Sequence, residues 1–177
     1  MNELNVAAIS DEVRKAVAAQ DGADGSLAAA FAALLFSRTD NAGTGAPVPE
    51  RLAKLALSAY DFYKERGDGA VKLRAYDFGD PALGSVTIIE SINDDMPFLL
   101  SSMLAEIIDR GFSVRFVAHP IIRARRDAQN QLIELGGTER LPGGGGRAES
   151  FVHIEIDPID SETDRQDLLR RLGEILD

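Results

Sequence analysis

A short polar segment, residues 93–96, places two carboxylates and an amide between an apolar β-type run (85–90) and an apolar helical pattern that runs to Arg110. Backbone N–H groups in the first turn of a helix have no intrahelical partners, so small anionic and zwitterionic ligands bind there. The carboxylates would hold the ammonium group of an amino acid, while the helix N-terminus attracts its carboxylate. The candidate ligand-binding residues are Asn93, Asp94, Asp95 and Met96.

The same side chains also have a purely structural interpretation. Asn and Asp at the start of a helix commonly accept hydrogen bonds from its first free N–H groups, and Pro97 suits the first helical turn. The two interpretations are compatible, because a capped helix still has N–H groups to offer a ligand. The sequence alone leaves both open.

Three arginines gather at the end of the third predicted strand, where the chain leaves its sheet: Arg123, Arg125 and Arg126. Guanidinium groups bind phosphate and carboxylate in a bidentate manner, so these residues are candidates for an anion site or for a contact with another domain. A solvent-exposed sheet edge protected by charge is the alternative. Glu155 and Asp157 are candidates to pair with these arginines across strands.

Catalytic and metal-binding patterns are weak in this chain. His119 and His153 would form a metal pair if their strands were neighbours, but no third ligand is evident and the chain has no cysteine. The four glycines at 143–146 lack the flanking strand and the Lys-Ser/Thr of a phosphate loop, so we expect a flexible connector. The sequence shows no Ser–His–Asp or Cys–His spacing and no dinucleotide fingerprint. It therefore predicts no catalytic residue, metal or cofactor for this chain.

The elements that position these side chains change in character along the chain. Residues 1–66 are helical in period, whereas residues 67–177 alternate strand-like and helical patterns. We therefore expect a helical N-terminal segment followed by an α+β domain. The predicted helices are 6–20, 27–37, 50–66, 96–110 and 161–177, and the predicted strands are 71–78, 86–92, 114–122, 132–135 and 151–156.

The order strand–helix–strand–strand–helix is close to the ferredoxin-like βαββαβ plan without its last strand, an antiparallel sheet with helices on one face. An open sheet edge is a pairing hazard, so we expect this position to be filled by 71–78, by a partner chain or by residues beyond Asp177. The last helical pattern begins at a capping Ser161 and stops without a terminator. A domain truncated at its C-terminus is expected, and a protein that ends on a helix is the alternative.

Composition limits the class of protein. Of 177 residues, 45% are hydrophobic, which is ordinary for a globular protein and enough to bury a core. The formal net charge of -10 excludes a general basic surface for nucleic acid or anionic membrane. No apolar run approaches the roughly 20 residues that span a bilayer, and the first eleven residues lack the layout of a signal peptide. We expect a cytoplasmic protein.

Several motifs together resemble the N-terminal region of the large bacterial NAD-specific glutamate dehydrogenases. The resemblance is strongest from about residue 71 to residue 157 and covers most of the chain. Its motifs are the β-run Val86-Thr87-Ile88-Ile89-Glu90, the string Asn93-Asp94-Asp95-Met96-Pro97-Phe98-Leu99, Gly111, His119-Pro120, Arg126-Asp127 and Phe151-Val152-His153-Ile154-Glu155-Ile156.

The resemblance implies an ACT-like domain, a ferredoxin-like regulatory fold whose members often bind amino acids at strand–helix junctions and sheet edges. It implies a non-catalytic regulatory and assembly region, because the family's catalytic part lies elsewhere and uses NAD to deaminate glutamate oxidatively to 2-oxoglutarate. The implied partners are the remainder of the same polypeptide, further copies in a homo-oligomer and an amino-acid effector.

One departure from the family pattern is Ser101-Ser102, where the resemblance leads us to expect an acidic residue. A contact from that position to the amino group of an effector would be lost in this chain. Two other functions stay open on the sequence: an oligomerisation scaffold without a ligand, and a free-standing protein that binds a small molecule.

Overall fold

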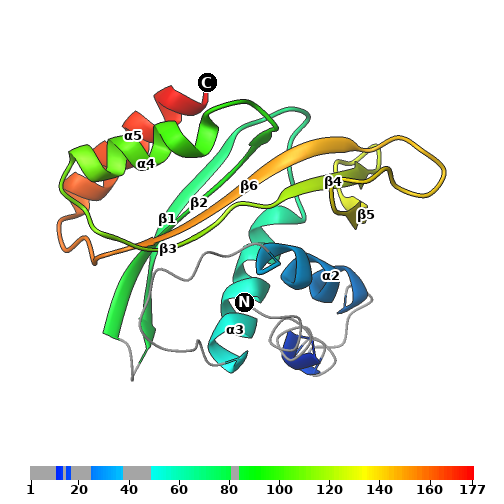
Figure 1. Ribbon diagram of the computed structural model, residues 1–177, viewed down its shortest axis with the longest axis horizontal. Coiled ribbons are helices and arrows are strands. Elements are labelled where there is room, and N and C mark those ends of the chain that lie inside the picture. The colour runs from blue at the N-terminus through cyan, green and yellow to red at the C-terminus, as the bar shows by residue number, and fades with distance from the viewer. Residues whose placement is uncertain (1–10, 14, 17–24, 38–48, 81–83) are drawn as a thin grey trace.

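Residues 11–13, 15, 16, 25–37, 49–80 and 84–177 are described by this computed structural model (Figure 1). The predicted helix at 6–20 lies mostly outside the described residues. The elements in chain order are α2 (Gly25–Leu35), α3 (Pro49–Tyr63), β1 (Lys72–Asp80), β2 (Gly84–Asp94), α4 (Leu99–Asp109), β3 (Val114–Ala118), β4 (Ile121–Arg126), β5 (Leu132–Gly136), β6 (Arg147–Ile156) and α5 (Glu162–Leu176).

The six strands form one antiparallel sheet in the order β1-β2-β6-β4-β5, and β3 also pairs with β6. The sequence predicted one strand at 114–122, but the structure has two, β3 and β4, which pair with successive parts of β6. They separate at Pro120, because proline has no N–H to donate to the ladder. Its carbonyl accepts a hydrogen bond from Phe151 N at 3.1 Å. The predicted short partner strand at 132–135 is confirmed as β5, which pairs with β4.

Strand β1 fills the edge position that the ferredoxin-like plan gives to its last strand. It pairs antiparallel with β2 over its whole length, from Lys72 opposite Ile92 to Asp80 opposite Gly84. The prediction of an α+β fold with a ferredoxin-like antiparallel sheet is confirmed. Of the three alternatives for the open edge, the structure shows the first, the strand that precedes β2 in the chain.

Helices cover both faces of the sheet (Figure 1): α4 and α5 lie on one face, as the plan predicts, and α2 and α3 lie on the other. Side chains of β6 alternate between the two layers, so Phe151 packs under α2 and α3 while Val152 packs under α4 and α5. Phe31 of α2, Tyr63 of α3 and Phe151 form a triangle of ring contacts. The N-terminal helices and the sheet therefore share a core, and the proposed domain division at residue 66 stays a prediction.

The helices α4 and α5 follow directly from their sequence patterns. The predicted cap of α5 is confirmed, because the side chain of Ser161 accepts a hydrogen bond from Asp164 N at 3.2 Å. Both helices bury apolar residues spaced four apart, which places these residues on one face. The buried residues are Leu99, Met103 and Ile107 in α4 and Leu168, Leu172 and Leu176 in α5.

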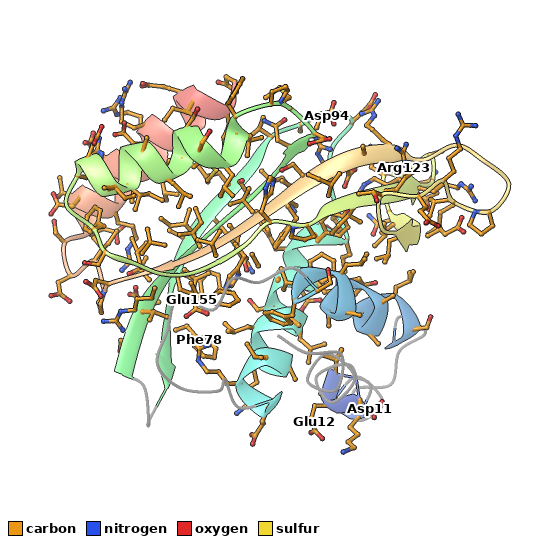
Figure 2. All side chains as sticks on the ribbon, in the orientation of Figure 1. Asp11, Glu12, Phe78, Asp94, Arg123 and Glu155 are labelled. Atoms are coloured by element: carbon orange, nitrogen blue, oxygen red, sulfur yellow. The ribbon has the colours of Figure 1, made fainter. Side chains whose placement is uncertain are left out.

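The α3 layer is fixed by buried charge as well as by apolar packing. His153 of β6 is fully buried, with Nδ1 2.8 Å from Glu90 Oε1 and Nε2 3.6 Å from Glu155 Oε1. Arg51 of α3 donates two hydrogen bonds to Glu155, and Arg74 of β1 donates one to Glu90. Glu155 points from the sheet toward the α3 side (Figure 2). Ionic contacts thus join α3, β1, β2 and β6 between the layers.

The charge state of His153 follows from this environment. Burial opposes the charged ring, since desolvation disfavours an imidazolium. The negative charges of Glu155 and Glu90, and the hydrogen bond between Nδ1 and Glu90, outweigh burial and raise the pKa of His153 from 6.5 to about 9. At neutral pH the ring is therefore an imidazolium that links two buried carboxylates.

Stability should decrease at alkaline pH because of His153. The folded pKa is raised, so the contribution of this group is complete below pH 6.5 and is lost as the pH rises through 9. Between about pH 6 and about pH 10, urea denaturation should show a loss of roughly 3 kcal/mol that His153→Gln does not show. His119→Gln serves as the control, and an equal pH dependence in the wild type and His153→Gln would contradict the assignment.

Candidate functional site

The polar segment singled out in the sequence lies at the junction between β2 and α4, and its first residue is committed to the fold. Asn93 is 5% exposed, and its Nδ2 donates to the carbonyl oxygen of Leu176 at 2.8 Å. Its Oδ1 accepts a hydrogen bond from the N–H of Asp94 at 2.8 Å. Asn93 therefore ties the end of α5 to the end of β2 and has little left to offer a ligand.

Asp94 is bound to the opposite layer of the molecule. Its Oδ1 accepts a hydrogen bond at 2.9 Å from Nη1 of Arg66, a residue that is 3% exposed and follows α3. The same Nη1 lies 3.3 Å from Glu149 Oε1 on β6. Asp94 thus acts as a tether between the junction and a buried guanidinium, which the sequence did not reveal.

Asp95 and Met96 are the two candidates that face solvent. The N–H of Asp95 continues the sheet by donating to the carbonyl oxygen of Ala148 at 3.1 Å. Its carboxylate makes no hydrogen bond or ion pair within the described part of the chain. Met96 is 42% exposed. Of the four predicted ligand-binding residues, these two are open to a partner.

Helix α4 begins later than predicted and without a side-chain cap. Its N-cap residue is Phe98, with φ at 65°, and no side chain accepts a hydrogen bond from its first N–H groups. The interpretation that Asn93, Asp94 or Asp95 caps this helix is therefore wrong, because β2 extends through Asp94 and Asn93 turns to α5.

Phe98 is the most unusual residue of the junction. A left-handed backbone costs a residue with a side chain roughly 1–2 kcal/mol, and an exposed aromatic ring gains little packing in return. Phe98 adopts this conformation and is 82% exposed. The chain thus holds an apolar ring in solvent beside the first, uncapped turn of α4.

A hydrogen-bonded pair that sequence reasoning missed lies beside the junction. His119 Nε2 is 2.7 Å from Ser150 Oγ, and Ser150 is opposite Asn93 in the sheet register. Burial lowers the pKa of His119, and the negative charge of Asp95 opposes this shift, so the ring is neutral at neutral pH. Ser150 is 1% exposed, which closes its hydroxyl to a substrate. Only the strand register, which local pattern does not reveal, could have identified this pair.

The two histidines considered as a metal pair lie on opposite faces of the sheet. His119 contacts Ser150 on the α4 side, whereas His153 packs against Phe116 on the α3 side. The structure does not bring them together. Among the described residues, no cluster of three or more His, Asp or Glu side chains is placed to hold a metal ion. In the same residues, no helix is long and apolar enough to cross a membrane.

The three predicted arginines differ in what they contact. Arg125 binds Glu134 and carbonyl groups of the glycine-rich loop, among them Pro142 O at 2.9 Å. Arg126 makes a bidentate pair with Glu149, with both N–O distances at 3.0 Å. Arg123 forms no hydrogen bond or ion pair with the described residues, and Figure 2 shows it at the same end of the sheet as Asp94.

The predicted acidic partners of these arginines are wrong. Glu155 pairs with Arg51 of α3, at 2.8 Å, and Asp157 pairs with Arg115 of β3, at 2.6 Å. The reason is topological, because β4 pairs with the first half of β6, whereas Glu155 lies in its second half and Asp157 follows the strand. The carboxylate that reaches Arg126 is that of Glu149.

Comparison with known proteins gives related sequences but no solved fold. NAD-specific glutamate dehydrogenase of Halomonas elongata is 28% identical over 123 residues, which are 68% of this chain and 8% of that protein. The enzyme of the same name from Pseudomonas aeruginosa is 33% identical over 75 residues, 40% of this chain and 4% of that protein. The chain thus matches less than a tenth of the length of either relative. No solved structure matches it.

A family of domains matches a larger part of this chain than either relative does. The sequence model described as "Glutamate dehydrogenase, ACT1 domain" matches residues 31–172, from within α2 to within α5. The matched region contains every strand of the sheet and the whole β2–α4 junction. The chain therefore belongs to the ACT1 domain family of glutamate dehydrogenases.

Proposed function

We propose that this chain is a non-catalytic regulatory and assembly domain of a larger NAD-dependent glutamate dehydrogenase, which oxidatively deaminates glutamate to 2-oxoglutarate. Two relatives named as NAD-specific glutamate dehydrogenases support the proposal. The part that matches this chain is 8% of the length of one relative and 4% of the length of the other. NAD would bind in another part of that cytoplasmic enzyme. The partners of this domain would be the remainder of the polypeptide and further copies in a homo-oligomer.

The observation that carries the assembly role is the exposed Phe98 at the β2–α4 junction. An apolar ring that is 82% exposed on a left-handed residue is a cost to the isolated domain. Met96, 42% exposed, lies two residues away and extends the apolar surface. Aromatic and methionine side chains that are exposed in a free domain are typical of the surfaces that become buried at the centre of a protein interface. The junction is thus built to dock against another part of the enzyme.

A regulatory role through an amino-acid effector rests on a smaller set of groups than the sequence predicted. Asn93 and Asp94 are engaged by Leu176 and Arg66. Two groups remain available to an amino acid. The Asp95 carboxylate can bind its ammonium group, and the uncapped first turn of α4 can bind its carboxylate. A scaffold without a ligand is the alternative, and the engagement of Asn93 and Asp94 favours it.

Docking of the junction should be visible by hydrogen–deuterium exchange. Backbone amides of residues 98–102 should exchange more slowly in the longer enzyme than in this chain alone, because a partner excludes water from them. In the longer enzyme, Phe98→Ser should restore faster exchange, whereas Ile133→Ser, at a 52% exposed apolar residue of β5, should not. Equal exchange in the short and long polypeptides would overturn the docking role.

Backbone strain at Phe98 can be separated from its side chain. Phe98→Ala and Phe98→Gly both remove the ring, but only glycine adopts the left-handed conformation without steric cost. The glycine variant should therefore be more stable than the alanine variant by about 1 kcal/mol in urea denaturation. A glycine variant no more stable than the alanine variant would show that residue 98 is not held at positive φ.

Effector binding should raise the melting temperature, since a ligand that binds only the folded state stabilises it. An amino acid at ten times its Kd adds about 1.4 kcal/mol, or about 3–5 °C for a domain of this size. A thermal-shift screen against the twenty amino acids measures this. Asp95→Ala should abolish the shift and Asp109→Ala, at the other end of α4, should not. If no amino acid raises the melting temperature, or if the rise persists in Asp95→Ala, the effector site is contradicted and the scaffold without a ligand is favoured.

A further inference from the structure

A second polar site, whose lining residues do not include Asp95, Met96 or Phe98 of the β2–α4 junction, is a cavity of about 470 Å³. It is formed by the loop after α3, the end of β4, the turn that follows β4 and the start of β6. We propose that this cavity binds the oxyanion group, phosphate or carboxylate, of a small ligand. The lining residues that carry the argument are Gly67, Asp68, Gly69, Arg126, Arg147 and Glu149.

Backbone donors on one wall are available to an anion. The N–H groups of Gly67, Asp68 and Gly69 make no hydrogen bond with the described residues. Gly69 has φ at 65° in a turn that the N–H of Ala70 closes by donating to the carbonyl oxygen of Gly67 at 3.1 Å, and such turns can present successive N–H groups to one anion. Such concave groups of N–H donors bind phosphate and carboxylate oxygens in many proteins. This wall is therefore suited to an oxyanion.

A guanidinium with unused donors lies over the same loop. Arg147 Nη1 is 3.7 Å from the position that a Cβ on Gly69 would occupy, so the arginine crosses the loop closely. The side chain is 53% exposed, and its contact within the described chain is one hydrogen bond to Asp68 Oδ1 at 3.0 Å. Its Nε and Nη2 groups are left for a ligand, in the fork geometry that matches a carboxylate or phosphate.

Arg126 and Glu149 line the cavity, and the buried guanidinium of Arg66, which is not a lining residue, contacts Glu149. Glu149, with a side chain 2% exposed, is shared by two guanidinium groups, those of Arg126 at 12% and Arg66 at 1% exposure. The carboxylate that offsets the second guanidinium is Asp94, whose side chain is 48% exposed and therefore well solvated. The two guanidinium groups are thus offset by two carboxylates, so an anion that enters the cavity meets no net negative charge from this group of side chains.

The acidic residues that line the cavity do not prevent an anion from binding there. Glu149 is held by Arg126 and Arg66, and Oδ1 of Asp127 accepts hydrogen bonds from the N–H groups of Gln129 and Gln131. Asp68 is the acidic residue that competes for Arg147, and its side chain is 82% exposed. A ligand oxyanion can therefore displace Asp68 into solvent at small cost.

The test is a titration of this chain with inorganic phosphate and, separately, with succinate, followed by isothermal calorimetry and by amide NMR shifts. Saturable binding of either anion should shift the amides of residues 67–69. Arg147→Gln should weaken binding by about tenfold or more, because it removes charge-assisted hydrogen bonds. Asp68→Asn should tighten it a few-fold by removing the competing carboxylate. Arg115→Gln, which breaks an exposed ion pair elsewhere, should leave it unchanged.

The two anions distinguish the source of the oxyanion. Preference for phosphate indicates a phosphorylated ligand, and preference for succinate indicates a carboxylic acid. No saturable binding of either anion, or binding that Arg147→Gln leaves intact, overturns the proposal. The exposed positions of Asp68 and Arg147 keep both variants folded, so loss of binding reports on the site itself. The result is independent of the role proposed for the β2–α4 junction, because none of the variants touches Asp95 or Phe98.

Discussion

Buried ions between the sheet and α3 are the constraint on which the rest of the structure depends. An imidazolium at His153 is surrounded by two glutamates, and each glutamate receives an arginine from a different element, α3 or β1. Removal of one partner from such a set typically costs about 3–5 kcal/mol, because a buried charge is left uncompensated. The network therefore permits one placement of α3 on the sheet, and apolar packing by α2 and α3 fills the space around it.

Much of the fold could be predicted from the sequence, since long helices and alternating strands leave strong local patterns. The cap at Ser161, the strand pattern at 71–78 and the helix-covered antiparallel sheet all follow from those patterns. Two features could not be read locally. Pro120 interrupts a strand that its apolar neighbours would continue, and the second layer of helices is positioned by contacts between residues far apart in the chain, such as Arg51 and Glu155.

The position of the candidate site could be predicted from the sequence, but not which of its side chains are free to bind a ligand. Local pattern correctly put polar residues at a strand–helix junction, but it could not say that Asn93 and Asp94 are occupied by α5 and by Arg66. Those contacts depend on strand register and on helix packing. The same limit applies to the arginines, because the pattern that groups Arg123 with Arg126 does not show that Arg126 is bound to Glu149.

The position of β1 has a consequence for the way this domain is connected. In the ferredoxin-like plan, the strand at this edge of the sheet is the last one in the sequence. In this chain the same edge is occupied by β1, which precedes the other strands, so the order of strands is a circular permutation of that plan. Asp80 pairs with Gly84, which makes the closing contact local in sequence, instead of a return across α5. Local pairings lower the contact order and the entropy of loop closure, and both favour rapid folding. The permuted order thus lets the β1–β2 ribbon form early, before the rest of the sheet is in place.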